Sequence, residues 1–122
     1  MSKLITSTQF LNISVKVKPG AVAGEYKVET APSIPRITQP DTVINYQIVD
    51  TGGVDIVFTG MSVTPEDNNQ LSAAIVSVSG KQLTFSDANS EKITLNVTLK
   101  FKAENQHEFA HDPQVENEPE PT

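Results

Sequence analysis

Residues 93–102 read Ile-Thr-Leu-Asn-Val-Thr-Leu-Lys-Phe-Lys, and this stretch decides the fold class. Apolar side chains occupy every second position, and polar or charged side chains stand between them. Successive side chains of a β-strand point to opposite faces of the sheet. Strict alternation over such a length therefore predicts a strand with one buried face and one solvent-exposed face.

The same alternation recurs along the chain on the N-terminal side of this strand. Six further segments alternate in this way: 11–17, 26–29, 44–48, 54–58, 73–78 and 83–85. Turn-forming sequences separate several of them, as at 18–20 (Lys-Pro-Gly) and 50–53 (Asp-Thr-Gly-Gly). Three prolines between residues 30 and 41 indicate a long irregular connection instead of a central strand.

About seven strands with no intervening helical pattern predict antiparallel sheets that each bury one face. We expect an all-β fold, an immunoglobulin-like antiparallel β-sandwich, with a small β-barrel as the alternative. The chain contains no cysteine and no tryptophan, so the antibody type of sandwich is excluded. Disulfide scaffolds and cysteine-based zinc sites are excluded for the same reason.

The 122-residue chain has a formal net charge of −6, and this charge is unevenly distributed. Residues 1–102 hold nine acidic and nine basic side chains, whereas residues 103–122 hold six acidic and no basic ones. Few apolar residues accompany those charges, which is typical of a segment that does not pack into a core. We expect a β-sandwich domain at 1–103 and an irregular, acidic, proline-rich tail at 104–122.

The acidic balance argues against nucleic acid or an anionic membrane as a partner. Polar residues interrupt the N-terminal sequence after only two apolar ones, so no secretory signal is predicted. No apolar run approaches the length of a transmembrane helix. We therefore expect a cytoplasmic protein.

The tail contains the sequence His107-Glu108-Phe109-Ala110-His111, which spells the His-Glu-x-x-His pattern of zinc proteases. That chemistry needs a helix, which places both imidazoles on one face beside the glutamate. Here a predicted strand ends a few residues upstream and Pro113 follows shortly downstream. We expect no metal and no catalytic residue, and keep a small zinc-dependent hydrolase using His107, Glu108 and His111 as an alternative.

Two polar loops, 65–70 and 86–91, are rich in oxygen-bearing side chains. Neither loop has the glycine and glutamate spacing of an EF-hand, and ordinary turn chemistry accounts for both. A calcium-binding surface module remains a further alternative on these loops.

Five lysines fall on the polar faces of the first and last predicted strands or beside them: Lys16, Lys18, Lys92, Lys100 and Lys102. If those two strands lie side by side, the lysines form a stripe onto which the acidic tail could fold and cover a sheet edge.

The tail also reads Asp112-Pro113, a short spacer and Glu118-Pro119. This arrangement resembles a small bacterial family named for those dipeptides, the DP-EP family, and the strand at 93–99 looks similar too. The resemblance implies an uncharacterised β-domain with a signature tail at Asp112, Pro113, Glu118 and Pro119, and it implies no activity, cofactor or substrate.

These observations favour a non-enzymatic binding or structural module without a cofactor. Its tail is expected to be an interaction element, in cis or in trans. A protein is the expected partner, including a second copy joined through exposed edge strands.

Overall fold

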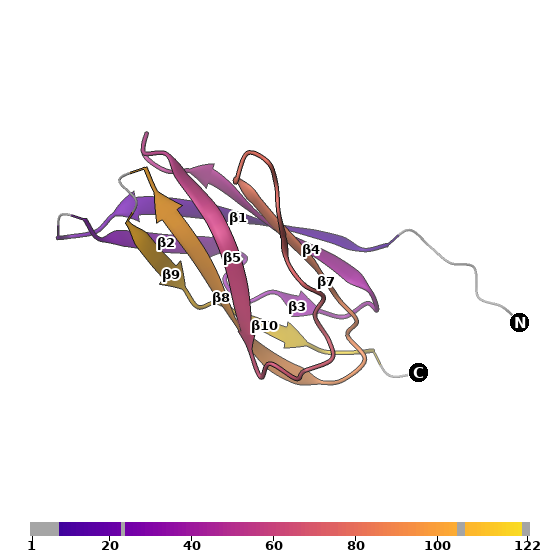
Figure 1. The fold of residues 1–122 in the computed structure, drawn as a ribbon. Coiled ribbons are helices and arrows are strands. Elements are labelled where there is room, and N and C mark those ends of the chain that lie inside the picture. Colours follow the sequence, from indigo (N-terminus) through magenta and orange to yellow (C-terminus); the bar gives the residue numbers. More distant parts are fainter. Residues whose placement is uncertain (1–7, 23, 105–106, 121–122) are drawn as a thin grey trace, which may run out of the picture.

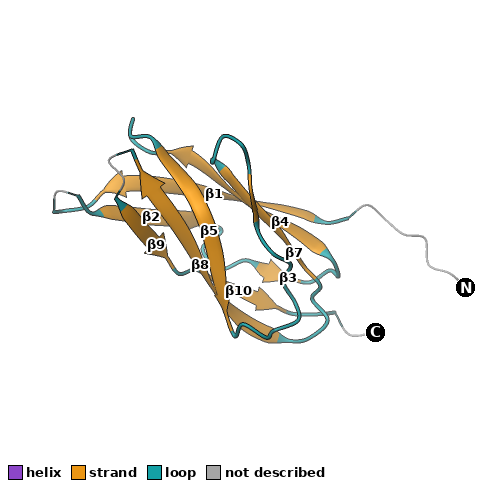
Figure 2. Ribbon diagram, viewed as in Figure 1, coloured by secondary structure: helices purple, strands orange, loops and turns teal. Residues whose placement is uncertain are grey.

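The computed structural model describes residues 8–22, 24–104 and 107–120, and it is built from strands arranged in two layers (Figure 1). The strands are β1 (Phe10–Pro19), β2 (Tyr26–Ala31), β3 (Arg36–Ile37), β4 (Thr42–Asp50), β5 (Ile56–Thr64), β6 (Ile75–Val76), β7 (Gln82–Asp87), β8 (Ile93–Ala103), β9 (Glu108–His111) and β10 (Gln114–Asn117). The described residues contain no helix (Figure 2), and so no helix that could cross a membrane.

One sheet has the strand order β2-β1-β4-β7-β6, and the other has the order β3-β10-β8-β5 with β9 also paired to β8. The two sheets stack without closing into a barrel, so the all-β sandwich is confirmed and the barrel alternative is wrong. The immunoglobulin-like assignment stays an interpretation.

The sheets are mixed, and not purely antiparallel as expected: β1 pairs with β4, and β3 with β10, in parallel. The proline-containing connection explains the first parallel pair. It takes the chain from β2 through β3 in the opposite sheet before β4 returns to the free side of β1.

The stretch 93–102 forms most of β8, and its alternation is preserved in the structure. Leu95, Val97, Leu99 and Phe101 are at most 1% exposed, while the residues between them face outward. They pack between the sheets against inward-facing residues such as Ile13, Tyr46 and Leu83, each 0% exposed. Burial of these apolar side chains is the main favourable contribution to folding.

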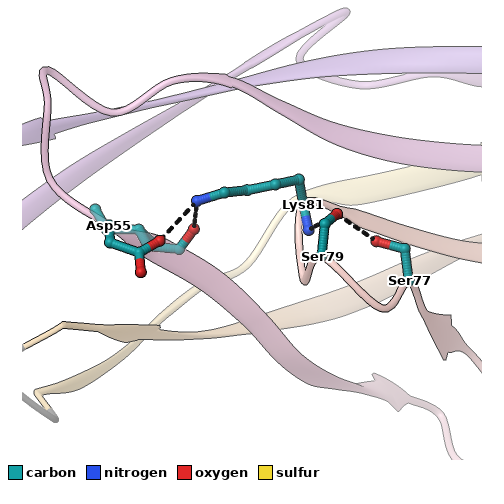
Figure 3. Close-up of polar contacts among 5 residues, drawn as sticks. Asp55, Ser77, Ser79 and Lys81 are labelled. Atoms are coloured by element: carbon teal, nitrogen blue, oxygen red, sulfur yellow. Dashed lines mark hydrogen bonds and ion pairs between the residues drawn. The ribbon is translucent and has the colours of Figure 1, made fainter.

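On the β5 side, the turn before β7 ties the two sheets together. The backbone amide of Phe58 donates to the carbonyl of Gly80 at 2.8 Å. Lys81 Nζ donates to Asp55 Oδ1 at 3.1 Å and to the carbonyl of Ile56 at 2.6 Å (Figure 3). Figure 3 also shows the Ser77 and Ser79 hydroxyls, 3.1 Å apart, on the same turn.

The expectation of an irregular tail is wrong for residues 108–111 and 114–117, which are strands β9 and β10. Both pair with β8 and extend the second sheet beyond residue 103, so that the described residues form ten strands. The overall composition of the tail concealed its alternation. Phe109, Pro113 and Val115 stand two or four positions apart and are buried or partly buried, while the carboxylates of Glu108 and Asp112 beside them are exposed.

Candidate functional site

The Asp-Pro dipeptide lies in the middle of one line of strand that runs along β8. Leu99 faces His111 on one side of the dipeptide and Asn96 faces Gln114 on the other, so the register is unbroken across it. Thr98 Oγ1 donates to Asp112 Oδ1 at 2.7 Å, and the Val97 amide donates to the Pro113 carbonyl at 2.9 Å. Pro113 has no backbone N–H to donate to β8, so one hydrogen bond is missing from the ladder, but the register of the two strands is unchanged.

The Glu-Pro end of the segment is held by β3. The amides of Glu116 and Glu118 donate to the carbonyls of Pro35 and Ile37 at 3.0 and 2.8 Å. Arg36 Nε lies 3.6 Å from Glu116 Oε2 and 3.9 Å from Glu118 Oε1. The arginine side chain is 69% exposed, so these ion pairs contribute at most about 1 kcal/mol, and the backbone pairing dominates.

The lysine stripe does not form as expected, because the first and last long strands are in different sheets. Lys16 and Lys18 belong to β1, which pairs with β2 and β4. Lys100 and Lys102 belong to β8, and Lys92 immediately precedes it. Among the described residues, the tail carboxylates Glu116 and Glu118 make their ion pairs with Arg36, a residue to which no sequence pattern pointed.

A groove of about 480 Å³ lies between the edge strand β2 of one sheet and the β9–β10 line of the other. Its walls include Val28, Thr30 and Ile34 on one side and His111, Asp112 and Pro113 on the other. The Asp-Pro dipeptide therefore lines an open flank of the sandwich. Sequence reasoning missed the groove, because its two walls are about 80 residues apart along the chain.

Both walls of the groove carry outward-directed backbone groups. The backbone carbonyls of His107 and Pro113 accept hydrogen bonds from β8, so the odd-numbered residues of this line direct their backbone N–H and C=O groups toward β8. The even-numbered residues Ala110, Asp112 and Gln114 direct theirs away from β8. Within the described part of the chain, no backbone bond from these three residues on that side is found. The Gly20 amide donates to the Glu25 carbonyl, and in this register the odd-numbered residues of β2 direct their backbone groups toward β1. The even-numbered residues of β2 therefore direct their backbone groups outward.

An aromatic stack bridges the two sheets beside the groove. Tyr26 of β2 stacks on Phe109 of β9 with ring centroids 4.7 Å apart, and Phe109 stacks on Phe101 of β8 at 5.0 Å. The ring of His107 lies 6.1 Å from that of Tyr26. These contacts fix the spacing between the two edge strands at this point.

The His-Glu-x-x-His sequence lies on and just before strand β9, where its spacing does not suit a zinc protease. Four residues of extended strand span about 13 Å, and alternation sends Glu108 to the face opposite His107 and His111. The described residues include no group of three His, Cys, Asp or Glu side chains placed to hold a metal. Burial lowers the pKa of His111, and the neighbouring Asp112 opposes that shift.

The two oxygen-rich loops meet at one end of the sandwich, where the tail joins them. Gln70 Oε1 accepts from the Ser90 amide at 2.8 Å and from Asn117 Nδ2 at 3.2 Å. Asp87 Oδ1 accepts from Asn117 Nδ2 and from the Asn89 amide, both at 2.9 Å. Asp87 is 0% and Asn117 1% exposed, and burial raises the pKa of Asp87. The sequence offered one indication that Asn117 belongs to this buried network: it stands two residues after Val115, on the inward-facing side of the alternation.

The comparison with models of protein families gives a match to this chain. The model of the DP-EP family matches residues 9–119, which cover both walls of the groove and the buried polar network. No curated protein matches the chain.

Proposed function

We propose that this chain, which belongs to the DP-EP family, is a non-enzymatic protein-binding module. The groove between β2 and the β9–β10 line takes an extended segment of a partner protein. The C-terminal segment works in cis, as the strand that builds one wall of that groove. One observation carries the proposal: outward-directed strand backbones line both sides of the same groove.

An exposed strand edge binds an extended peptide by adding it to the sheet, with main-chain hydrogen bonds for affinity and side-chain pockets for specificity. Asp112 and Gln114 supply the main-chain groups on the β9–β10 wall, and Ala110 continues the same strand edge beyond the groove. Val28 and the 47%-exposed Ile34 supply an apolar surface for alternate side chains of the ligand. Most soluble proteins cover or blunt such an edge, so one that borders a groove is suited to binding.

The charges of the groove favour a basic ligand. Glu29 and Asp112 line it, and no lysine or arginine is found among its described lining residues. Glu29 also lies 3.9 Å from the exposed amines of Lys18 and Lys27, and such exposed pairs are weak enough for a ligand cation to replace them. Charge complementarity across an interface favours partners of opposite sign. The ligand is therefore an extended segment in which apolar residues alternate with lysine or arginine.

Selection from a displayed library of random short peptides tests the proposal, with affinities measured by titration calorimetry. We expect enrichment of peptides that alternate apolar and basic residues. Ile34→Lys, in the groove, removes an apolar contact and adds a charge of the same sign as the ligand, so it should weaken their binding at least about tenfold. Val49→Lys is the matched control, because Val49 is 51% exposed on β4 and is not among the residues lining the groove.

Two results would overturn the proposal. One is equal binding to Ile34→Lys and the unmodified chain. The other is concentration-dependent dimerisation that Ile34→Lys abolishes, which would identify a second copy as the occupant of the groove.

A further inference from the structure

Among the residues that the structure describes, three buried side-chain oxygens have no hydrogen-bond partner at the end of the sandwich where β10 docks. They are Asp87 Oδ2, Asn89 Oδ1 and Asn117 Oδ1, in residues that are 0%, 4% and 1% exposed. All three residues belong to the network that joins the end of β7 to β10. A buried acceptor left unpaired carries a desolvation penalty of its own, so three in one network point to a missing donor.

The donor that fits is a proton on Asp87. Asn117 Nδ2 already donates to Asp87 Oδ1 at 2.9 Å. A carboxylate can only accept hydrogen bonds, whereas a protonated carboxyl also donates one. With the proton on Oδ2, Asp87 can return a bond to the Asn117 amide oxygen and complete a paired acid–amide contact, which satisfies two of the three oxygens.

Within the described part of the chain, no lysine or arginine forms an ion pair with Asp87, and the nearby Lys92 lines a surface cavity beside Asn117. Thr42 of β4 lies opposite Asp87 in the sheet, and Leu71 forms a bridge with it. Asn117 faces it from β10, and Asn89 from the following loop. The charged residues that join this network through their backbones, Asp41 and Glu91, are both acidic.

We propose that a proton on Asp87 latches the C-terminal strand: the protonated carboxyl donates to Asn117 and joins β10 to the end of β7. The latch is strongest at low pH, where Asp87 is protonated. It weakens when Asp87 ionises, because the buried carboxylate then faces amide oxygens and has no proton to donate to them. The inference does not depend on which ligand the groove takes.

The sign of the pH dependence follows from linkage. Burial raises the pKa of Asp87 above its unfolded value, while its two hydrogen bonds oppose the shift. The folded protein therefore holds this proton more tightly than the unfolded chain does. The stabilisation is complete below the ordinary aspartate pKa of about 3.9, and it is lost as the pH rises through the raised folded pKa.

Asp87→Asn tests the latch, because an asparagine has the shape of the protonated acid and donates at every pH. At about pH 8 the variant should melt at least about 4 °C above the unmodified protein, and the difference should shrink at about pH 4. The protection factors of the amides of residues 114–118, which correct for the intrinsic rise of exchange with pH, should fall as the pH rises in the unmodified chain and stay flat in Asp87→Asn.

Asp112→Asn is the matched control, since Asp112 is an exposed carboxylate of the same C-terminal segment that also accepts a hydrogen bond. Asp112→Asn should leave the pH dependence of amide protection over residues 114–118 the same as in the unmodified chain. The proposal is overturned if Asp87→Asn is less stable than the unmodified protein at both pH values. It is also overturned if calcium chloride raises the melting temperature only while Asp87 is present, because a cation would then occupy the site.

Discussion

At the scale of single residues, backbone conformation and close contact make particular positions irreplaceable. Gly80 has a φ of +76°, and a Cβ added there would lie 2.6 Å from Cβ of Val57. Its carbonyl also accepts the amide of Phe58, which joins the two sheets. The turn therefore depends on a residue without a side chain.

Gly80→Ala should lower the free energy of unfolding by about 2–4 kcal/mol, from left-handed strain plus steric contact with Val57. Gly24→Ala provides the comparison, because Gly24 has a φ of +89° and nothing within 4 Å of the added Cβ. It should lose only about 1–2 kcal/mol. Urea unfolding of both variants measures the difference, and equal losses would show that Val57 moves aside.

At the scale of the element, the C-terminal segment behaves as a strand of the core sheet. It covers the edge of β8 opposite β5, and Val115 within it is 0% exposed. Arg36 and the glutamates contribute little to this attachment, because exposed ion pairs are weak. The anchoring lies in backbone pairing, apolar burial and the Asn117 network.

Removal of residues 104–122 should abolish cooperative unfolding and expose apolar surface. Deletion uncovers the β8 edge together with Leu95 and Phe101, which are at most 1% exposed in the intact chain. Binding of a hydrophobic dye and the sharpness of the thermal transition report the change. Removal of 120–122 alone is the control and should leave both unchanged. A sharp transition at an unaltered temperature in the longer deletion would contradict this role.

At the scale of the whole molecule, the buried Asp87 and the partly buried His111 give stability opposite dependences on pH. Burial raises the pKa of Asp87 and lowers that of His111. The aspartate favours the folded state in acid. The histidine favours it at higher pH, because the unfolded chain takes up the histidine proton more readily.

His111→Gln should flatten the stability profile on the acidic side of the ordinary histidine pKa of about 6.5. In the unmodified chain, stability contributed by His111 is lost as the pH falls from above 6.5 toward the lowered folded pKa. Denaturant unfolding over a pH series measures the slope. If the variant showed the same slope, the loss of stability at acidic pH would have to come from a group other than His111.

Local alternation was sufficient to predict the sandwich and most of its core, because strand periodicity is written directly into the order of side chains. Residues 93–102 lie in the structure as their pattern predicts. Residues 109–117 also alternate between inward and outward positions, but the high charge of the tail led to the expectation of an irregular segment. The seven expected strands omitted both tail strands and the two-residue strand β3, which is too short to show a period. The strand expected at 73–78 is present, but it covers only Ile75–Val76 as β6.

The sequence by itself determined the all-β class, the buried faces and the position of the acidic segment. These are local properties, set by side-chain period and turn chemistry. Only the tertiary structure decided that Asp112 and Pro113 line a groove opposite Val28, and that Asp87 meets Asn117. Those contacts depend on which strand pairs with which and in what register. Strand pairing is a property of the whole sheet, set by the joint burial of residues far apart in the chain.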